Sequence, residues 1–216
     1  MSAPTSVFAL LKGIRALPVV AIDSVEDAVP LADALAEGGM PAIEVTLRTG
    51  AAFDVIAKLQ KERPKLLVGA GTVVTGAQMK SCAALGVKFA ISPGLTPGLL
   101  EVAHELRLPY LPGTATASDV MVGLQHGWRE FKFFPAEAAG GLAMLKSLAG
   151  PFADACFCPT GGITAQNAGA YMALANVVMV GSSSMMPAAA LKAKDWADIA
   201  RRTRAFTDAL SNVTSC

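Results

Sequence analysis

One lysine stands among phenylalanines in the stretch "EFKFFPAE" at positions 130–137. Side chains of an extended strand alternate between two faces, so Lys132 shares a face with Glu130 and Phe134, opposite Phe131 and Phe133. If Phe131 and Phe133 pack against helices, the amine of Lys132 points into the interior. Burial or a neighbouring cation lowers the pKa of a lysine amine from about 10.4 to about 7–8, and the neutral amine attacks carbonyls to form a Schiff base.

A second strand, "AIEVTLRTG" at positions 42–50, carries an acidic and a basic residue on one face. Glu44, Thr46 and Arg48 share this face, and the apolar residues between them share the other. Charges inside a fold are costly unless they are paired or used. Glu44 could move protons at the carbon beside an imine, while Arg48 could hold a carboxylate by a two-point fork. Two structural alternatives remain: a Glu44–Arg48 ion pair, or Lys132 acting only as the counter-ion of Glu44.

Two glycine-containing strand ends indicate an anion site. The stretch "CPTGGITAQN" (158–167) ends a strand at Thr160, Gly161 and Gly162, and "VMVGSSSMMP" (178–187) ends another at Gly181 with three hydroxyls. Glycines let backbone N–H groups approach a phosphate, and a helix N-terminus assists them. Phosphate sites of this kind form after strands seven and eight of a parallel barrel.

Other strand ends carry fewer chemical groups. In "VGAGTV" (68–73), Thr72 points inward, where its hydroxyl could hold a carboxylate or a water, and Pro93 in "ISPG" (91–94) is expected to form a wall of the site. Turn or capping roles are expected for Ser92 and Thr116. Glu137 is expected to be an acid in the first turn of a helix.

The elements that must position these residues follow a regular rhythm. Apolar strand-like runs begin near Leu17, Ala42, Leu66, Phe89, Pro109, Glu130, Cys156 and Val177. Most are followed by a helical segment, and eight such units predict an α/β fold, a single (β/α)8 TIM barrel domain over residues 1–216. An extra N-terminal helix around 5–13 and a final helix over 196–210 complete it. The rival is an open doubly wound sheet, but no G-x-G-x-x-G follows the first strand.

Composition restricts the functional classes. With 53% hydrophobic and 16% charged residues and a net charge of +1, the chain shows no electrostatic signature of a nucleic-acid or membrane partner. Its four cysteines and two histidines have no disulfide or zinc spacing, so we expect small buried thiols in a reduced cytoplasm. Lys12 and Arg15 interrupt the apolar N-terminus, which is therefore not expected to be a signal peptide. The apolar stretch 171–191 contains Asn176 and three serines, unlike a membrane span.

Several motifs resemble one family in order along the chain: "EVTLRT" (44–49), "VGAGTV" (68–73), "FAISPG" (89–94), "EFKFFPAE" (130–137), "GPF" (150–152), "FCPTGGI" (157–163) and the Gly-Ser-Ser of 181–183. The chain is similar to 2-dehydro-3-deoxy-6-phosphogluconate aldolases, a family that includes enzymes active on 4-hydroxy-2-oxoglutarate. The resemblance implies a cytoplasmic class I lyase of the Entner–Doudoroff pathway, without metal or cofactor, assembled as a homotrimer. Lys132 would form the Schiff base and Glu44 would be the general acid–base. The products would be pyruvate and D-glyceraldehyde 3-phosphate.

The substrate-binding residues implied by the resemblance all lie at strand ends: Arg48, Thr72, Pro93, Phe134, Thr160, Gly161, Gly162 and Ser183. The first two would hold the pyruvate carboxylate, and the next two would line the pocket. Thr160 would contact the acceptor end, and the last three would bind the phosphate. Many relatives have Gly-Ser-Trp after the eighth strand where this chain has Ser182, Ser183 and Ser184, so which hydroxyl binds phosphate stays open.

The sequence leaves two rival functions open. A phosphosugar isomerase or epimerase on the same barrel would use Glu44 as its base and would need no imine at Lys132. A barrel that only binds or assembles would need none of Glu44, Arg48 and Lys132, yet all three are present. The sequence leaves open the relative activity on the six-carbon phosphorylated and the five-carbon dicarboxylate substrates.

Overall fold

The computed structural model describes residues 5–211. The strands are β1 (Ala16–Val20), β2 (Ala42–Thr46), β3 (Leu67–Gly71), β4 (Phe89–Ile91), β5 (Tyr110–Leu111), β6 (Gly113–Thr114), β7 (Glu130–Phe133), β8 (Cys156–Pro159) and β9 (Val180–Ser182). The helices are α1 (Val7–Leu10), the 3-10 helix η1 (Val25–Asp27), α2 (Ala28–Glu37), α3 (Ala52–Glu62), α4 (Gly76–Ala84), α5 (Pro97–Leu106), α6 (Ala117–Gln125), α7 (Gly141–Ala149), α8 (Ala168–Met172), α9 (Ala188–Ala193) and α10 (Trp196–Ser211). Cys216, expected to be a buried thiol, lies outside the described residues.

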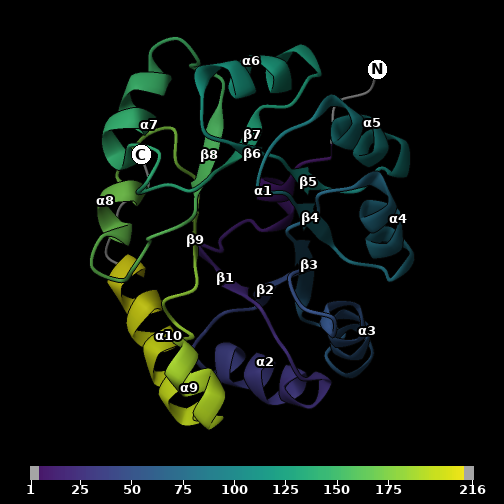
Figure 1. The fold of residues 1–216 in the computed structure, drawn as a ribbon. Helices are drawn as coiled ribbons and strands as arrows, with labels where there is room; N and C mark the ends of the chain where they lie inside the picture. The colour runs from purple at the N-terminus through teal and green to yellow at the C-terminus, as the bar shows by residue number, and fades with distance from the viewer. Residues whose placement is uncertain (1–4, 212–216) are drawn as a thin grey trace.

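The strands pair in parallel within an α/β fold that resembles a barrel. A six-stranded sheet has the order β5-β4-β3-β2-β1-β9, and a three-stranded sheet has the order β6-β7-β8. Parallel bridges between Phe157 and Val177 and between Thr160 and Gly181 join β8 to the β9 region. Figure 1 views the strands nearly end-on, with the helices around them. The carboxyl ends of these strands therefore meet at one end of the molecule.

Two strands differ from their predicted extent. The fifth predicted strand is divided at Pro112 into β5 and β6, because proline has no N–H to donate to a ladder. Its carbonyl still accepts a hydrogen bond from the Lys132 N–H at 2.9 Å. The eighth strand begins at Val180 and not near Val177, which contributes only an isolated bridge.

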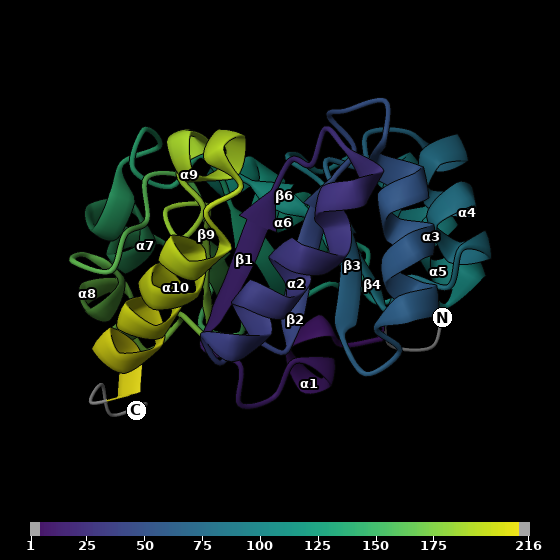
Figure 2. The ribbon, with the colours of Figure 1, turned by 90° about the horizontal axis from the view of Figure 1, so that it is seen from below.

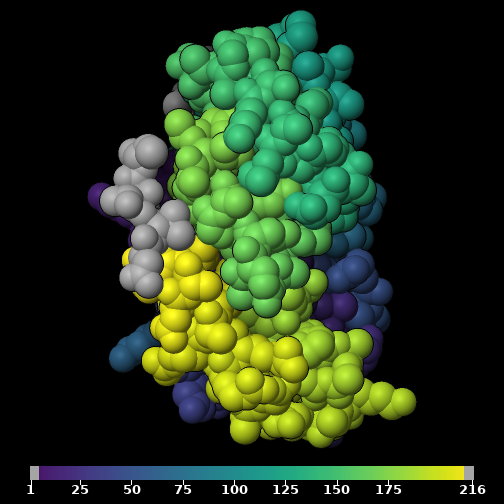
Figure 3. Space-filling view, turned by 90° about the vertical axis from the view of Figure 1, so that its left-hand side faces the viewer, coloured from purple at the N-terminus to yellow at the C-terminus, as the bar shows by residue number. Residues whose placement is uncertain are grey.

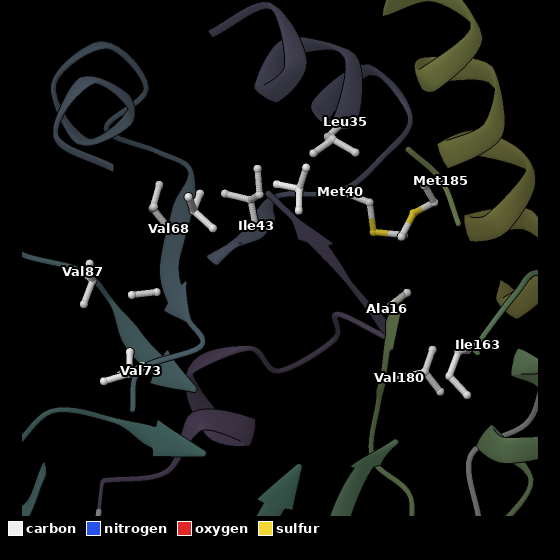
Figure 4. Packing of buried hydrophobic residues seen from close by; sticks show 14 of the residues in the cluster. Ala16, Leu35, Met40, Ile43, Val68, Val73, Val87, Ile163, Val180 and Met185 are labelled. Carbon is white, nitrogen blue, oxygen red and sulfur yellow. The ribbon is translucent and has the colours of Figure 1, made fainter. Parts of the chain in front are cut away.

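The alternation of side chains along the strands divides the core into two layers. The larger layer lies between sheet and helices and includes Ile43, Val45, Phe131 and Phe133. Figure 4 shows Leu35 of α2 close to Ile43 of β2 in this layer. Since the apolar residues of β2 and β7 face the helices, the polar residues between them are directed to the interior. The strand parity predicted from the sequence is confirmed.

The interior layer is closed at one end by α1. Val7 and Leu11 belong to a smaller buried cluster with Leu17, Phe89 and other inward residues of the strands. Figure 2 shows α1 below the strands, at the end opposite to the one toward which β1 points. The predicted N-terminal helix over 5–13 is shorter, Val7–Leu10. It leaves the carboxyl ends of the strands open for a site.

The last helix packs along the outside of the fold. α10 runs from Trp196 to Ser211, close to the predicted 196–210, and contacts α2, α8 and α9. Figure 3 shows α10 in yellow beside α9 and the green α7–α8 region on one face. Between residues 5 and 211, no helix combines the length and the apolar character needed to cross a membrane.

Candidate active site

A buried ion pair lies between β7 and β2. The Nζ of Lys132 donates to Glu44, with distances of 3.0 Å to Oε1 and 3.5 Å to Oε2. Lys132 is 5% exposed and Glu44 is 1% exposed, so the pair is withdrawn from water. The Lys132 Nζ also lies 5.3 Å from the centre of the Phe134 ring, within the range of a cation–π contact. An amine and a carboxylate in direct contact can exchange a proton.

A cavity of about 340 Å³ surrounds this pair at the carboxyl ends of the strands. All ten residues expected at the site line it: Glu44, Arg48, Thr72, Pro93, Lys132, Phe134, Thr160, Gly161, Gly162 and Ser183. Val19, Thr46, Ile163 and Ser182 complete the lining. The structure therefore brings these ten residues together from six different strand ends.

Two polar residues, Arg48 and Thr72, line the cavity on the Glu44 side. The Nε of Arg48 donates to the Thr46 hydroxyl at 3.1 Å, and that hydroxyl donates to the Val20 carbonyl at 3.0 Å. This chain fixes the guanidinium stem on β2. Thr72 has a φ of 57°, in the left-handed region that a β-branched residue adopts at a cost of about 1–3 kcal/mol. Such strain at a cavity wall is typical of a functional position.

Two glycines make room for polar side chains of neighbouring strands. A Cβ on Gly71 would lie 2.6 Å from Cγ and 2.7 Å from Cδ of Glu44, closer than real Cβ atoms approach. A Cβ on Gly181 would lie 3.0 Å from Cγ2 of Thr160. From the sequence, neither glycine was expected to make room for a neighbouring side chain. The pattern of side-chain types along the sequence does not indicate the space that Gly71 and Gly181 leave on the inner face.

The Gly161–Gly162 turn borders the other end of the cavity. Both glycines have positive φ, 102° and 79°, a conformation that glycine adopts without strain. The hydroxyl of Ser182 donates to the Ile163 carbonyl at 2.7 Å and lies 2.9 Å from the Ser184 hydroxyl. Ser182 is therefore buried and engaged in the protein's own contacts, whereas Ser183 is exposed and lines the cavity.

A rigid network supports the Pro93 wall. The hydroxyl of Ser92 donates to the Gly94 carbonyl at 2.5 Å and lies 2.6 Å from the Tyr110 hydroxyl. The N–H of Gly113 donates to the same Ser92 oxygen at 3.3 Å. Ser92 thus has the turn role that was expected. Thr116 likewise forms the N-cap of α6, as expected, so it lies outside the site.

A second, larger cavity of about 760 Å³ adjoins the first and shares Val19, Arg48 and Ser183 with it. It lies between the segment after β1 and helix α9, with Leu191 and Trp196 among its apolar walls. It lacks the Lys132–Glu44 pair. The smaller cavity therefore contains the chemically active groups.

Two residues were assigned wrongly from the sequence. Cys156 was expected to be a buried thiol but is only half-buried. Glu137 was expected in the first turn of a helix, but α7 begins only at Gly141. Glu137 lies in the turn after β7, and its carboxylate accepts a hydrogen bond from the Tyr171 hydroxyl of α8. A contact between residues this far apart in the sequence has no local signal.

Together, the barrel-like fold and the buried lysine beside a carboxylate define a Schiff-base lyase, an enzyme that breaks a carbon–carbon bond through an imine. A family model described as KDPG and KHG aldolase matches residues 7–202; the two abbreviations stand for 2-dehydro-3-deoxy-6-phosphogluconate and 4-hydroxy-2-oxoglutarate. The KHG/KDPG aldolase of Escherichia coli K12 is 46% identical over 93% of this chain and 94% of its own length. The chain belongs to the KDPG and KHG aldolase family.

Two solved structures extend this likeness to three dimensions. The KDPG aldolase of Legionella pneumophila, with pyruvate captured at low pH as a covalent carbinolamine intermediate, is 44% identical with a TM-score of 0.91, over 94% of this chain and 98% of its own. The aldolase of Zymomonas mobilis ZM4 with 3-phosphoglycerate is 39% identical with a TM-score of 0.88, over 96% of each chain.

Proposed function

We propose that the protein cleaves 2-dehydro-3-deoxy-6-phosphogluconate to pyruvate and D-glyceraldehyde 3-phosphate through a Schiff base at Lys132. The observation that carries this proposal is the 3.0 Å contact between the Lys132 amine and Glu44, both buried in a cavity at the strand ends. The covalent pyruvate carbinolamine captured in the Legionella relative supports a covalent intermediate in this family.

Glu44 can carry the protons of each step. It takes a proton from Lys132, and the neutral amine attacks the C2 ketone to give a carbinolamine. Glu44 returns this proton to the carbinolamine hydroxyl, which leaves as water to form the iminium. Glu44, directly or through a water, then removes the proton of the C4 hydroxyl. The C3–C4 bond breaks, its electron pair enters the iminium to give an enamine, and the C4 oxygen becomes the aldehyde. Protonation at C3 and hydrolysis release pyruvate and the free amine.

Arg48 and Thr72 are proposed to bind the substrate carboxylate. Arg48 lines the cavity and its Nε donates to Thr46, so its two terminal nitrogens would serve as a fork for two carboxylate oxygens. Thr72, with its positive φ, lines the same cavity, and its hydroxyl would donate to the carboxylate. Pro93 and Phe134 would then form the walls along the carbon chain.

The opposite end of the cavity suits the acceptor half of the substrate. Thr160 would contact the acceptor carbons, and Gly161, Gly162 and Ser183 would bind the phosphate. Ser183 is favoured over Ser182 because the hydroxyl of Ser182 is already bonded to Ile163. The Zymomonas structure with 3-phosphoglycerate supports a phosphate ligand in the family.

The protein's wider properties are also proposals. We propose one domain over residues 1–216, a closed (β/α)8 barrel with α1 as the extra N-terminal helix and with β5 and β6 counted as one strand. The bridges between β8 and β9 and the short Pro112 break between β5 and β6 support closure. A cytoplasmic homotrimer without cofactor is proposed from the family resemblance. Activity on 4-hydroxy-2-oxoglutarate is supported by the name of the Escherichia coli relative.

Borohydride trapping tests the mechanism. With pyruvate and borohydride, mass spectrometry should find a reduced adduct on Lys132 in the folded wild type and none at this position in Lys132→Ala. The exposed Lys88→Ala is a matched control and should trap normally. Glu44→Gln should slow cleavage while still allowing slow imine formation. Absence of the wild-type adduct would favour the isomerase or epimerase, which needs no imine.

A further inference from the structure

A hydrogen-bonded pair lies behind the Gly161–Gly162 turn. Tyr171 of α8 is fully buried, and its hydroxyl donates to Oε1 of Glu137, in the segment that continues from the Lys132 strand. Burial raises the pKa of the Tyr171 hydroxyl, and the Glu137 carboxylate raises it further. The hydroxyl therefore stays protonated and remains a donor across the physiological pH range.

The side chain of Glu137 packs directly on the turn. A Cβ on Gly162 would lie 2.5 Å from Cγ and 2.9 Å from Cβ of Glu137, so only glycine leaves room for this contact. Tyr171 itself packs on Gly141, where a Cβ would lie 3.0 Å from the Tyr171 hydroxyl oxygen. The turn thus lies on a Glu137 side chain that Tyr171 holds in place.

The backbone hydrogen bonds orient the peptide groups of the turn. The carbonyls of Thr160 and Gly161 accept from the N–H groups of Ala136 at 2.7 Å and Glu137 at 3.1 Å, and the Gly162 carbonyl accepts from Asn167 at 3.0 Å. In a trans peptide the N–H points opposite to the preceding carbonyl. Each carbonyl that accepts one of these hydrogen bonds therefore directs the N–H of the following residue away from the hydrogen-bond donor. Successive N–H groups arranged in this way form a concave anion site.

We infer that Tyr171 and Glu137 are positioning residues that hold the Gly161–Gly162 turn in its anion-binding form and so set the preference for phosphorylated substrates. This inference rests on the proposed aldolase function. The hydroxyl also holds the Glu137 carboxylate on the Tyr171 side. Without the Tyr171 hydroxyl, the negatively charged Glu137 carboxylate is free to turn toward the phosphate and repel it.

The test compares two substrates that differ only in the phosphate. Steady-state kinetics of Tyr171→Phe are measured with 2-dehydro-3-deoxy-6-phosphogluconate and with 2-dehydro-3-deoxygluconate, and inorganic phosphate is used as a competitive inhibitor. Loss of a hydrogen bond to a charged group predicts about a tenfold rise in KM for the phosphorylated substrate, with kcat nearly unchanged. The inhibition constant of phosphate should rise by the same factor. The KM for the unphosphorylated substrate should not change.

Three further variants separate positioning from general damage. Glu137→Ala removes the side chain on which the turn packs and should also raise the KM for the phosphorylated substrate. Glu137→Gln keeps an acceptor for the Tyr171 hydroxyl and should have a KM near the wild-type value. Tyr110→Phe removes an equally buried hydroxyl beside Ser92 and should not change the two substrates differently. An equal rise in KM for both substrates in Tyr171→Phe, or no rise, overturns the inference. Failure of wild-type pyruvate trapping would instead overturn the proposed function.

Discussion

The carboxylate of Glu44 occupies the space that a side chain on Gly71 would need. The two residues lie on the adjacent strands β2 and β3, and a Cβ at position 71 would come within 2.7 Å of the Glu44 Cδ. The same carboxylate contacts the Lys132 amine at 3.0 Å. The absence of a side chain at position 71 therefore determines where the proposed general base lies relative to the nucleophile.

Gly71→Ala should disable the site without unfolding the protein. The atoms that the new methyl would meet belong to a side chain that can rotate, so Glu44 moves while the strands stay in place. A misplaced general base costs about 10²–10⁴-fold in rate. We expect kcat to fall by at least about 100-fold, with slower borohydride trapping of pyruvate. Gly98→Ala, where a Cβ meets nothing within 4 Å, is the matched control and should keep full activity. Normal turnover of Gly71→Ala would show that Glu44 has room elsewhere or is not the base.

The ion pair also makes a prediction about stability. Lys132→Met leaves the carboxylate of Glu44 buried without its partner, and breaking a buried pair in this way costs about 3–5 kcal/mol in the free energy of unfolding. The double variant Lys132→Met with Glu44→Gln removes the uncompensated charge and should recover part of that loss. Urea denaturation of both variants measures the difference. Equal stabilities would mean that Glu44 is already neutral or solvated in the single variant.

The inward direction of Lys132 and Glu44 could be predicted from the sequence, because both strands alternate strictly and their apolar residues had to face the helices. The meeting of the two at one cavity followed from parallel strands, whose carboxyl ends share one end of the fold. Thr72, Pro93 and the Gly161–Gly162 turn reached the same cavity for the same reason. The alternation of side chains and the shared end of parallel strands therefore predicted most of the site.

The interactions that escaped prediction join a strand or a turn to a distant helix. Glu130 shares a face with Lys132, yet its carboxylate binds the N-terminus of α1, more than 120 residues away. Glu137 lies in an irregular turn where a helix was expected, and it contacts Tyr171 on another helix. Neither contact has a sequence period or a local motif. Their partners are fixed only when the tertiary fold brings the segments together.

Burial of Cys82 should make the protein less stable in alkali. Burial raises the pKa of this thiol from 9.0 to about 11, so the folded state keeps its proton where the unfolded chain has released it. The contribution of the buried Cys82 thiol to the free energy of unfolding is complete below about pH 9. It is lost as the pH rises from about 9 to about 11. The stability advantage of wild type over Cys82→Ala should therefore shrink between about pH 8 and about pH 10.5, measured by urea denaturation. A constant difference would contradict this prediction.

The last prediction concerns the closed end of the fold. The carboxylate of Glu130 accepts from the N–H groups of Val7 at 2.8 Å and Phe8 at 3.0 Å, and from the Ser6 hydroxyl. These bonds satisfy the first donors of α1, and a negative charge at a helix N-terminus is favourable.

Glu130→Ala should lower the free energy of unfolding by about 1–3 kcal/mol, because the part-buried N–H donors of Val7 and Phe8 lose their acceptor. kcat should stay unchanged, since α1 lies at the end of the strands opposite the cavity. Glu105→Ala, an exposed acid on α5, is the matched control and should change neither quantity. Denaturation with urea and steady-state kinetics measure both. A fall in kcat at unchanged stability would mean that Glu130 acts on the site and does not anchor α1.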